Sequence, residues 1–328
     1  MNRRETVFTL LAVGASSLPC FAQRAGQIYR LGILGTADRS DWRNEPYTRA
    51  FLQRLRELGF VEGLNLVIER RDSQGNAEKL PGLAAELAQQ NCDVLVAPGT
   101  ESVLVALKQA TRDTPIVVWA NDYDPVATGH IASFARPGGR ITGVSMLQAE
   151  LPAKRVELLK ELLPHAKRIA VFSDSASTGQ LNVAQAAAKQ LGLNLEVFEF
   201  KRQPYDYENA FAGAVRVKAE ALLQLGSAFF VPARQLIPAL ALKYRLPSMF
   251  HHSAWAEAGG LLSYGPNFSK SNRRVAEYVG MILNGRKPAD LPVEQPTTFE
   301  LVVNAKTAKA LGVTIPGLIL LRADRLIE

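Results

Sequence analysis

From about residue 28 onward, short apolar runs alternate with longer stretches in which apolar residues recur every three or four positions. Cys92–Ala97 and Pro115–Ala120 are apolar throughout, whereas Glu45–Leu58 places its leucines and phenylalanine on one helical face. Continuous apolar runs are typical of strands buried on both faces, and the intervening periodicity predicts amphipathic helices. The first half of the chain therefore predicts a parallel sheet covered by helices on both sides.

The same alternation begins again after Pro152. Arg168–Ser173 and Ala221–Leu225 predict buried strands, and Asn272–Leu283 predicts a helix with one apolar face. The two halves meet near 147–152, and a proline-rich stretch over 287–296 indicates a further crossing between them. The whole pattern predicts an α/β protein with two doubly wound parallel-sheet lobes.

The N-terminal segment follows a different pattern. Met1–Arg4 is cationic, Val7–Pro19 is an apolar run rich in small residues, and Cys20–Ala22 suits cleavage by a signal peptidase. This layout predicts a secretory signal peptide over residues 1–22, because the apolar run is too short to span a bilayer. We therefore expect export to the periplasm. Lipid attachment at Cys20 is the less favoured alternative, and the choice between general and twin-arginine export stays open.

Composition narrows the class of protein. The 328 residues are 47% hydrophobic and 21% charged, which is ordinary for a globular chain and sufficient for two cores. The net charge of +7 is spread along the chain instead of forming a basic stripe, so we expect no nucleic-acid partner. Once Cys20 leaves with the signal peptide, Cys92 is the only cysteine, and its apolar setting predicts an inert core thiol.

Polar residues gather directly after the predicted strands. In open parallel sheets, ligands bind beyond the carboxyl ends of the strands, where helix N-termini present free N–H groups. These loops supply candidate ligand-binding residues in both halves of the chain. The candidates are Thr36, Asp38, Gly99, Thr100, Glu101, Asn121, Asp122, Tyr123, Asp124, Ser173, Asp174, Ser227 and Tyr264.

Two of these loops indicate specific chemistry. Gly99 permits a tight turn, and the Thr100 hydroxyl with nearby backbone N–H groups could bind a carboxylate, unless Thr100 only caps its helix. Asp122 and Asp124 flank an aromatic residue, which suits an ammonium or hydroxyl group, although both acids could instead form the turn. Trp42 lies on the first loop, and we favour packing over ligand contact for its ring.

The sequence carries no enzyme signature that we can identify. Gly32 and Gly35 lack the third glycine of a dinucleotide-binding loop, and no glycine-rich stretch ends in Lys-Ser or Lys-Thr. Gly143–Ser145 lacks the closing glycine of a nucleophile elbow, and the 4 histidines have no metal-binding spacing. We therefore expect a protein that binds its ligand without turnover and that uses neither a metal nor another cofactor.

Several segments of the chain resemble one known family. They are Arg56–Asn65, Leu80–Leu87, Asp124–Val126, Ser133–Gly139, Thr142–Ser145, Glu257–Pro266, Lys287–Thr297, Phe299–Asn304 and Lys306–Gly312. Through these segments the chain resembles the periplasmic solute-binding proteins of ABC importers, specifically the tryptophan/tyrosine-type ABC substrate-binding family. The resemblance implies the type I periplasmic-binding fold, in which two lobes joined by a three-crossing hinge close on a ligand.

The resemblance also implies domain boundaries and partners. Lobe 1 is expected to comprise residues 28–147 plus 265–292, and lobe 2 residues 148–264 plus 293–328. The chain would act as a monomer that delivers its ligand to an ABC permease and an ATPase at the inner membrane.

The resemblance bears on the ligand as well. Thr100, Asp124 and Tyr264 match positions where the family tends to have polar cleft residues, but Gly226–Ser227 replaces a position that is often acidic in relatives. The ligand class therefore stays open. The ligand is either an amino acid, which includes the aromatic amino acids, or another aromatic or carboxylate solute. Our leading hypothesis is an importer component, and the alternative is a periplasmic ligand sensor that docks on a membrane receptor.

Overall fold

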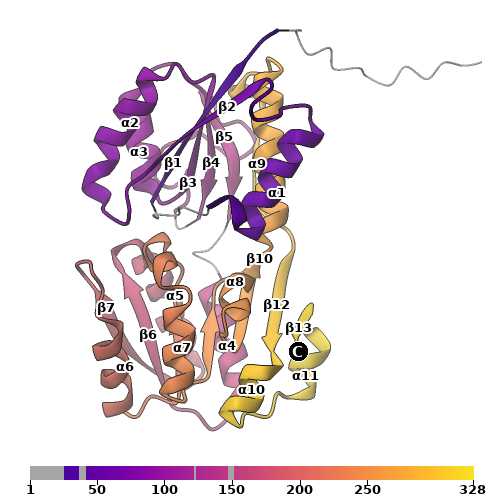
Figure 1. Cartoon of the computed structure of the whole chain (residues 1–328). Helices are drawn as coiled ribbons and strands as arrows, with labels where there is room; N and C mark the ends of the chain where they lie inside the picture. The colour runs from indigo at the N-terminus through magenta and orange to yellow at the C-terminus, as the bar shows by residue number, and fades with distance from the viewer. Residues whose placement is uncertain (1–25, 37–41, 122, 147–150) are drawn as a thin grey trace, which may run out of the picture.

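The computed structural model describes residues 26–36, 42–121, 123–146 and 151–328. This part of the chain folds into two lobes, each built on its own β-sheet (Figure 1). The expected signal peptide over 1–22, Asp38, Asp122 and the segment 147–150 between the lobes lie outside the described residues. Among the helices of the described ranges, none is long and apolar enough to cross a membrane.

The first lobe is built on a parallel sheet with the strand order β11-β5-β4-β3-β1-β2. Its strands are β1 (Tyr29–Gly35), β2 (Leu66–Asp72), β3 (Val94–Gly99), β4 (Ile116–Ala120), β5 (Ile141–Ser145) and β11 (Val293–Glu294). Its helices are α1 (Pro46–Glu57), α2 (Leu80–Gln89), α3 (Glu101–Ala110) and α9 (Phe268–Leu283), with 3-10 turns η1 (Trp42–Asn44), η2 (Ala77–Lys79) and η6 (Pro288–Asp290).

Side-chain alternation along the strands divides this lobe into two cores. On β4, Val117 and Trp119 pack with α1 and α9 on one face of the sheet, whereas Ile116 and Val118 pack with α2 and α3 on the other. Both faces are therefore buried, which explains why the strands read as continuous apolar runs. The alternation also places the Trp119 ring beside α9, at the carboxyl end of its strand.

The second lobe is built on a sheet with the strand order β13-β12-β10-β9-β8-β6-β7. Its strands are β6 (Arg168–Asp174), β7 (Asn194–Phe200), β8 (Ala221–Gln224), β9 (Ser248–Phe250), β10 (Leu262–Pro266), β12 (Phe299–Asn304) and β13 (Arg325–Ile327). Its helices are α4 (Pro152–Leu162), α5 (Thr178–Gln190), α6 (Tyr207–Arg216), α7 (Leu236–Lys243), α8 (Ser253–Glu257), α10 (Ala305–Leu311) and α11 (Gly317–Arg322), with turns η4 (Ser175–Ser177) and η5 (Ala228–Ala233).

The α/β class and the two doubly wound lobes are confirmed, with one local departure. Strand β12 runs antiparallel to β10, so the second sheet is mixed where parallel strands were expected throughout. The reversal follows from the connectivity, because β12 enters the second lobe from the first lobe instead of returning over a helix of its own sheet.

The chain passes between the lobes from β5 to α4, from β10 to α9 and from β11 to β12. The strand pairing corrects two of the expected boundaries. Strand β10 runs to Pro266 within the second sheet, and Val293 and Glu294 pair with β5 in the first sheet. Residues 265–266 therefore belong to lobe 2, and residues 293–294 belong to lobe 1. Hydrogen bonds to a neighbouring strand decide these limits, and such bonds leave no periodicity in the sequence.

Asn267 joins two of the crossing segments. Its side-chain oxygen caps α9 by accepting from the Lys270 N–H at 2.9 Å, and its side-chain nitrogen donates to the Glu300 carboxylate at 3.0 Å. The residue thus connects the start of α9 to β12, which lies on the next crossing. An asparagine performs both tasks because its amide carries an acceptor and a donor.

Candidate functional site

A cavity of about 120 Å³ lies between the lobes. The first lobe contributes the carboxyl ends of β1, β3 and β4 and the first turns of α1 and α9, and the second lobe contributes η5 and the residues after β9. A single water molecule needs about 10–15 Å³ of such space, so the cavity is large enough for a small organic molecule. Its position beyond the carboxyl ends of parallel strands is the one expected for ligands in open α/β sheets.

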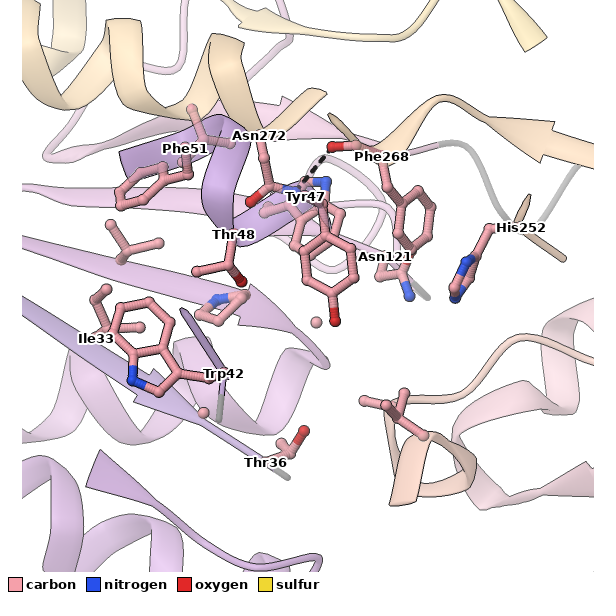
Figure 2. A pocket seen from close by; sticks show the side chains of 18 of the residues that line it. Ile33, Thr36, Trp42, Tyr47, Thr48, Phe51, Asn121, His252, Phe268 and Asn272 are labelled. Atoms are coloured by element: carbon pink, nitrogen blue, oxygen red, sulfur yellow. Dashed lines mark hydrogen bonds between the residues drawn. The ribbon is translucent and has the colours of Figure 1, made fainter. Parts of the chain in front are cut away.

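Aromatic rings form much of the cavity wall (Figure 2). The Trp119 ring meets Phe268 edge to face at a centroid distance of 4.9 Å, and it lies 5.8 Å from the Tyr47 ring. From the second lobe, His252 stacks on Phe268 at 4.3 Å. Figure 2 shows Trp42 on one side of the cavity and Phe268 with His252 on the other. Rings arranged in this way offer edges and faces to another flat ring.

Trp42 has a double role. Its side chain is buried in the first-lobe core, and its ring also lines the cavity. The guanidinium groups of Arg43 and Arg70 lie over this ring, at 4.7 Å and 4.6 Å from its centroid. Arg70 also donates two hydrogen bonds to Asp72, at 2.7 Å and 2.6 Å. The sequence-based expectation for Trp42 was packing, and the structure adds contact with the cavity.

Three residues of the cavity wall each carry a polar atom that is buried without a hydrogen-bond partner among the described residues. The atoms are Trp119 Nε1, Asn121 Oδ1 and His251 Nδ1. The Trp119 and Asn121 side chains come from the first lobe, and His251 comes from the second. Such atoms are rare in native structures, and each costs free energy unless a ligand or a solvent molecule satisfies it.

His251 is neutral at physiological pH. Complete burial lowers the pKa of its imidazole well below the ordinary value of 6.5, and the nearby positive charge of Arg155 lowers that pKa further. A neutral imidazole can either donate or accept at Nδ1, depending on its tautomer. His251 can therefore adapt to either kind of ligand group.

The lobes contact each other beside this cavity. Arg234, at the end of η5, donates two hydrogen bonds to the Glu45 carboxylate, at 2.6 Å and 2.8 Å. Glu45 immediately precedes α1 and is 8% exposed. At a second place, a methyl group added to Gly99 would lie 3.6 Å from the Ala228 side chain. The two lobes are therefore in direct contact next to the cavity.

The structure brings three of the candidate residues to the cavity wall. Thr36 follows β1, Gly99 ends β3 and Asn121 follows β4, so neighbouring strands of the first sheet carry them to one edge. Gly99 has φ of +90°, in the left-handed region where a side chain would be strained. At these three positions, the expectation that polar loops converge at strand ends agrees with the geometry.

The neighbouring first-lobe candidates make local contacts and do not line the cavity. The Thr100 hydroxyl lies 2.8 Å from the Ser102 hydroxyl and makes no capping bond to its helix. The Glu101 carboxylate lies 2.8 Å from His130 Nε2. The Tyr123 ring meets the His130 ring edge to face at 6.2 Å.

Asp124 forms a turn. Its carboxylate accepts from the backbone N–H groups of Val126 and Ala127, at 2.8 Å and 3.2 Å, which is the role of a turn former that the sequence analysis left open. Asp38 and Asp122, the two other acids proposed for the first lobe, lie outside the described residues.

The second-lobe candidates Ser173, Asp174 and Ser227 are buried and do not line the cavity, and Ser173 Oγ has no hydrogen-bond partner among the described residues. Ser227 Oγ donates to the Asp174 carboxylate at 2.6 Å, and Asp174 also caps η4 through Ala176 N–H at 3.1 Å. Burial raises the pKa of Asp174, although its hydrogen bonds act in the opposite direction. Ser173, next to Asp174, is 1% exposed.

Tyr264 also lies away from the cavity wall. Its backbone carbonyl accepts from Arg155 Nε at 2.8 Å, and its ring lies 6.1 Å from the Phe299 ring. These contacts connect α4, β10 and β12, which are the segments next to the crossings.

Sequence reasoning missed most of the aromatic wall. Tyr47 and Phe268 are in the first turns of helices. Tyr47 had no assigned role within the helix expected over Glu45–Leu58, and Phe268 lay outside the helix expected over Asn272–Leu283. Trp119 was one residue of an apolar strand. A bulky aromatic residue at the carboxyl end of such a strand, two positions before Asn121, is the one signal that could have marked it. In the described ranges, no group of three or more His, Cys, Asp or Glu side chains could hold a metal ion.

The family model of ABC transporter substrate binding proteins matches residues 46–327. The chain belongs to this family. The resemblance noted from the sequence is thereby confirmed, and the chain is a substrate-binding protein of the ABC transporter class. Its fold is that of type I periplasmic binding proteins.

Individual relatives agree with this assignment. The chain is 26% identical to the tyrosine-binding protein of Clostridioides difficile strain R20291, over 80% of this chain and 75% of that protein. A conserved domain protein from Vibrio cholerae has a TM-score of 0.82 at 26% identity, over 92% of this chain and all of the other. An ABC domain from Streptococcus pneumonia in complex with L-Trp has a TM-score of 0.79 at 25% identity, over the same shares.

Proposed function

We propose that this protein captures a small organic ligand between its lobes and delivers it to an ABC permease. The ligand would be an amino acid, aromatic ones included, or another aromatic or carboxylate solute. The observation that carries the proposal is the interlobe cavity, whose wall combines aromatic rings with polar residues at the carboxyl ends of parallel strands. The L-Trp complex and the tyrosine-binding relative support a ring-bearing ligand.

The geometry suggests how such a ligand would lie. Thr36 and Gly99 line the cavity and offer a hydroxyl group and backbone groups to a polar or carboxylate end. The rings of Trp119 and Phe268 offer an apolar surface to the remainder of the molecule. Closure of the second lobe would bury the ligand, and the permease would recognise the closed form as a shifted equilibrium.

A titration tests the proposal. The chain without residues 1–22 is heated with aromatic amino acids, branched amino acids and aromatic acids, each well above micromolar concentration. A ligand at one hundred times its dissociation constant stabilises the folded state by about 2.7 kcal/mol, which raises Tm by about 4 °C for a chain of this length. Absence of any shift across the three classes would contradict the proposal.

We further propose that the protein works in the periplasm as a monomer and releases its ligand unchanged. The predicted signal peptide and the family membership support export. Fractionation of cells carrying the full chain should place the processed protein in the periplasm. Mass spectrometry of the ligand before and after incubation should show one and the same compound, and any product of turnover would contradict the binding-only role.

A further inference from the structure

The two lobes also meet at the edge that lies opposite the crossings. The crossings leave from β5, β10 and β11, whereas β2 and β7 are the outermost strands at the other end of their sheets. Figure 1 shows β7 on the side of the second lobe away from β10 and β12. When lobes rotate about a hinge, points far from the hinge move furthest, so this edge separates most on opening.

Gly75 and Gln203 make the contact at this edge. Gly75 lies in the loop after β2, and Gln203 lies in the loop after β7. A Cβ atom added to Gly75 would lie 2.5 Å from Gln203 Oε1 and 3.0 Å from its Nε2. Gly75 is buried although its neighbours Gln74 and Asn76 are exposed. A side chain at position 75 would therefore displace the Gln203 amide group.

The first-lobe half of this contact is joined to the cavity wall. The Gly75 N–H donates to the Thr36 carbonyl, and the Ser73 N–H donates to the Gly35 carbonyl at 3.1 Å. Gly35 and Thr36 both line the cavity. The loop after β2 and this part of the wall are therefore held together.

The second-lobe half is joined to the wall through the Asp174 cluster. Burial raises the pKa of the Tyr205 hydroxyl above its ordinary value, and a hydrogen bond with the Gln203 side chain acts in the opposite direction. The same hydroxyl donates to the Asp174 carboxylate at 3.5 Å, and Asp174 accepts from Ser227 at the cap of η5. Residues of η5 line the cavity, so hydrogen bonds connect Gln203 to the second-lobe wall.

We propose that Gly75 and Gln203 form a latch that holds the lobes closed and slows the release of the ligand. This inference rests on the proposed function, because release requires a ligand between the lobes. The latch lies where opening separates the lobes most, so opening has to break it. Neither residue lines the cavity, so the latch should change the dissociation rate without changing which ligand binds.

The first experiment tests whether positions 75 and 203 meet. Processed protein that carries both Gly75→Cys and Gln203→Cys is oxidised mildly, alone and with L-tyrosine, L-leucine or benzoate. Peptide mapping should find a disulfide between the two positions. Burial raises the pKa of the native Cys92 thiol to about 11, so this thiol stays protonated and reacts slowly. Absence of the disulfide under every condition would overturn the inference and leave the proposed function intact.

Gly63→Cys combined with Gln203→Cys is the matched control. Gly63 also lies in the first lobe, and its φ of +82° is close to the +79° of Gly75. Apart from its chain neighbours, a Cβ atom added to Gly63 would have no atom within 4 Å. No disulfide should form in this pair. An equal yield in both pairs would overturn the inference, because oxidation would then report no specific contact.

The second experiment measures release by stopped flow. Gly75→Ala displaces the Gln203 amide group and Gln203→Ala removes it, so each should make dissociation of a bound probe about threefold faster. The double variant should be no faster than either single variant, because one contact is lost only once. Wild-type rates in the single variants, or additive effects in the double variant, would overturn the inference.

Gly63→Ala is the control for backbone strain. It places a side chain at a similar positive φ without a partner in the other lobe, so the probe should dissociate at the wild-type rate. Equal acceleration by Gly63→Ala and Gly75→Ala would overturn the latch. If the disulfide forms but none of the three probes binds, the proposed ligand classes fail, and the inference about release fails with them.

Discussion

The cavity wall and the polar cluster of the second lobe differ in where their hydrogen bonds go. On the wall, the Trp119 and Asn121 side chains each keep a polar atom that has no hydrogen-bond partner among the described residues. In the second-lobe cluster, Asp174 accepts from Ser227 and caps η4, so the acid and the hydroxyl satisfy each other. Both groups lie at or next to the carboxyl ends of strands. The difference teaches that a polar loop is a binding site only where its own neighbours leave it unsatisfied.

The second-lobe cluster still affects the cavity, through η5. Ser227 caps this turn by accepting from the Phe229 N–H at 3.1 Å, while its own hydroxyl donates to Asp174. The turn carries Ala228, which lines the cavity, and it ends at Arg234, which reaches across to Glu45. The cluster therefore positions the second-lobe side of the site without touching the ligand.

The largest effect on stability and affinity should come from removing the Trp119 ring from the cavity wall. Trp119→Ala removes a ring that belongs both to the first-lobe core and to the cavity. Loss of its packing should lower the free energy of unfolding by about 3–5 kcal/mol, and ring-bearing ligands should lose most of their affinity. Urea denaturation and calorimetric titration measure the two effects. Unchanged affinity in a folded Trp119→Ala protein would remove Trp119 from the site.

Removing the acid of the cluster should change stability and leave selectivity alone. Asp174→Ala leaves the Ser227 hydroxyl and the start of η4 without their acceptor, at a cost of about 1–3 kcal/mol in unfolding free energy. The order of affinities among the titrated ligands should stay that of the wild type. A changed order with stability unchanged would contradict the distinction between the cluster and the wall.

The contact between the lobes should govern ligand release. Arg234→Gln breaks the forked pair with Glu45, which holds the lobes together beside the cavity. Dissociation should become about fivefold faster in stopped-flow measurements, with a smaller change in the association rate. Glu57→Gln is the control, because it breaks a forked pair with Arg273 that joins α1 to α9 inside one lobe. Equal acceleration in both variants would contradict a role for lobe contact.

The smallest effect should appear in the pH dependence of stability, with opposite signs in the two regions. Burial lowers the pKa of His251 below that of the unfolded chain, so its contribution is present above pH 6.5 and is lost as pH falls through the folded-state pKa. Burial raises the pKa of Asp174, so its contribution is present below the unfolded pKa and is lost as pH rises through the folded-state value.

Two substitutions isolate these contributions. Relative to the wild type, His251→Gln should lose less stability on acidification below pH 6.5, and Asp174→Asn should lose less as pH rises through the folded-state pKa of the acid. Melting curves at several pH values measure both differences. A shift of the same sign in both variants would contradict the assigned directions.

Much of the fold could be predicted because it depends on periodicity. Continuous apolar runs and amphipathic stretches report burial directly, so the two doubly wound lobes followed from the pattern alone. The antiparallel β12 and the limits at 265–266 and 293–294 did not follow, because they depend on which strand supplies the hydrogen bonds. The candidate site could be predicted in part. Thr36, Gly99 and Asn121 line the cavity, whereas the acid that looked most suitable, Asp124, bonds to its own turn.

The sequence by itself determined the class of the protein, its two lobes and the strand ends at which a ligand could bind, because these features are local patterns repeated along the chain. Only the tertiary structure decided which residues meet the cavity. Tyr47, Trp119 and Phe268 are far apart in sequence, and strand order and helix packing bring their rings together. Whether a polar atom is free to bind a ligand depends on whether its neighbours in space already form hydrogen bonds with it. Those neighbours cannot be identified from the order of residues along the chain.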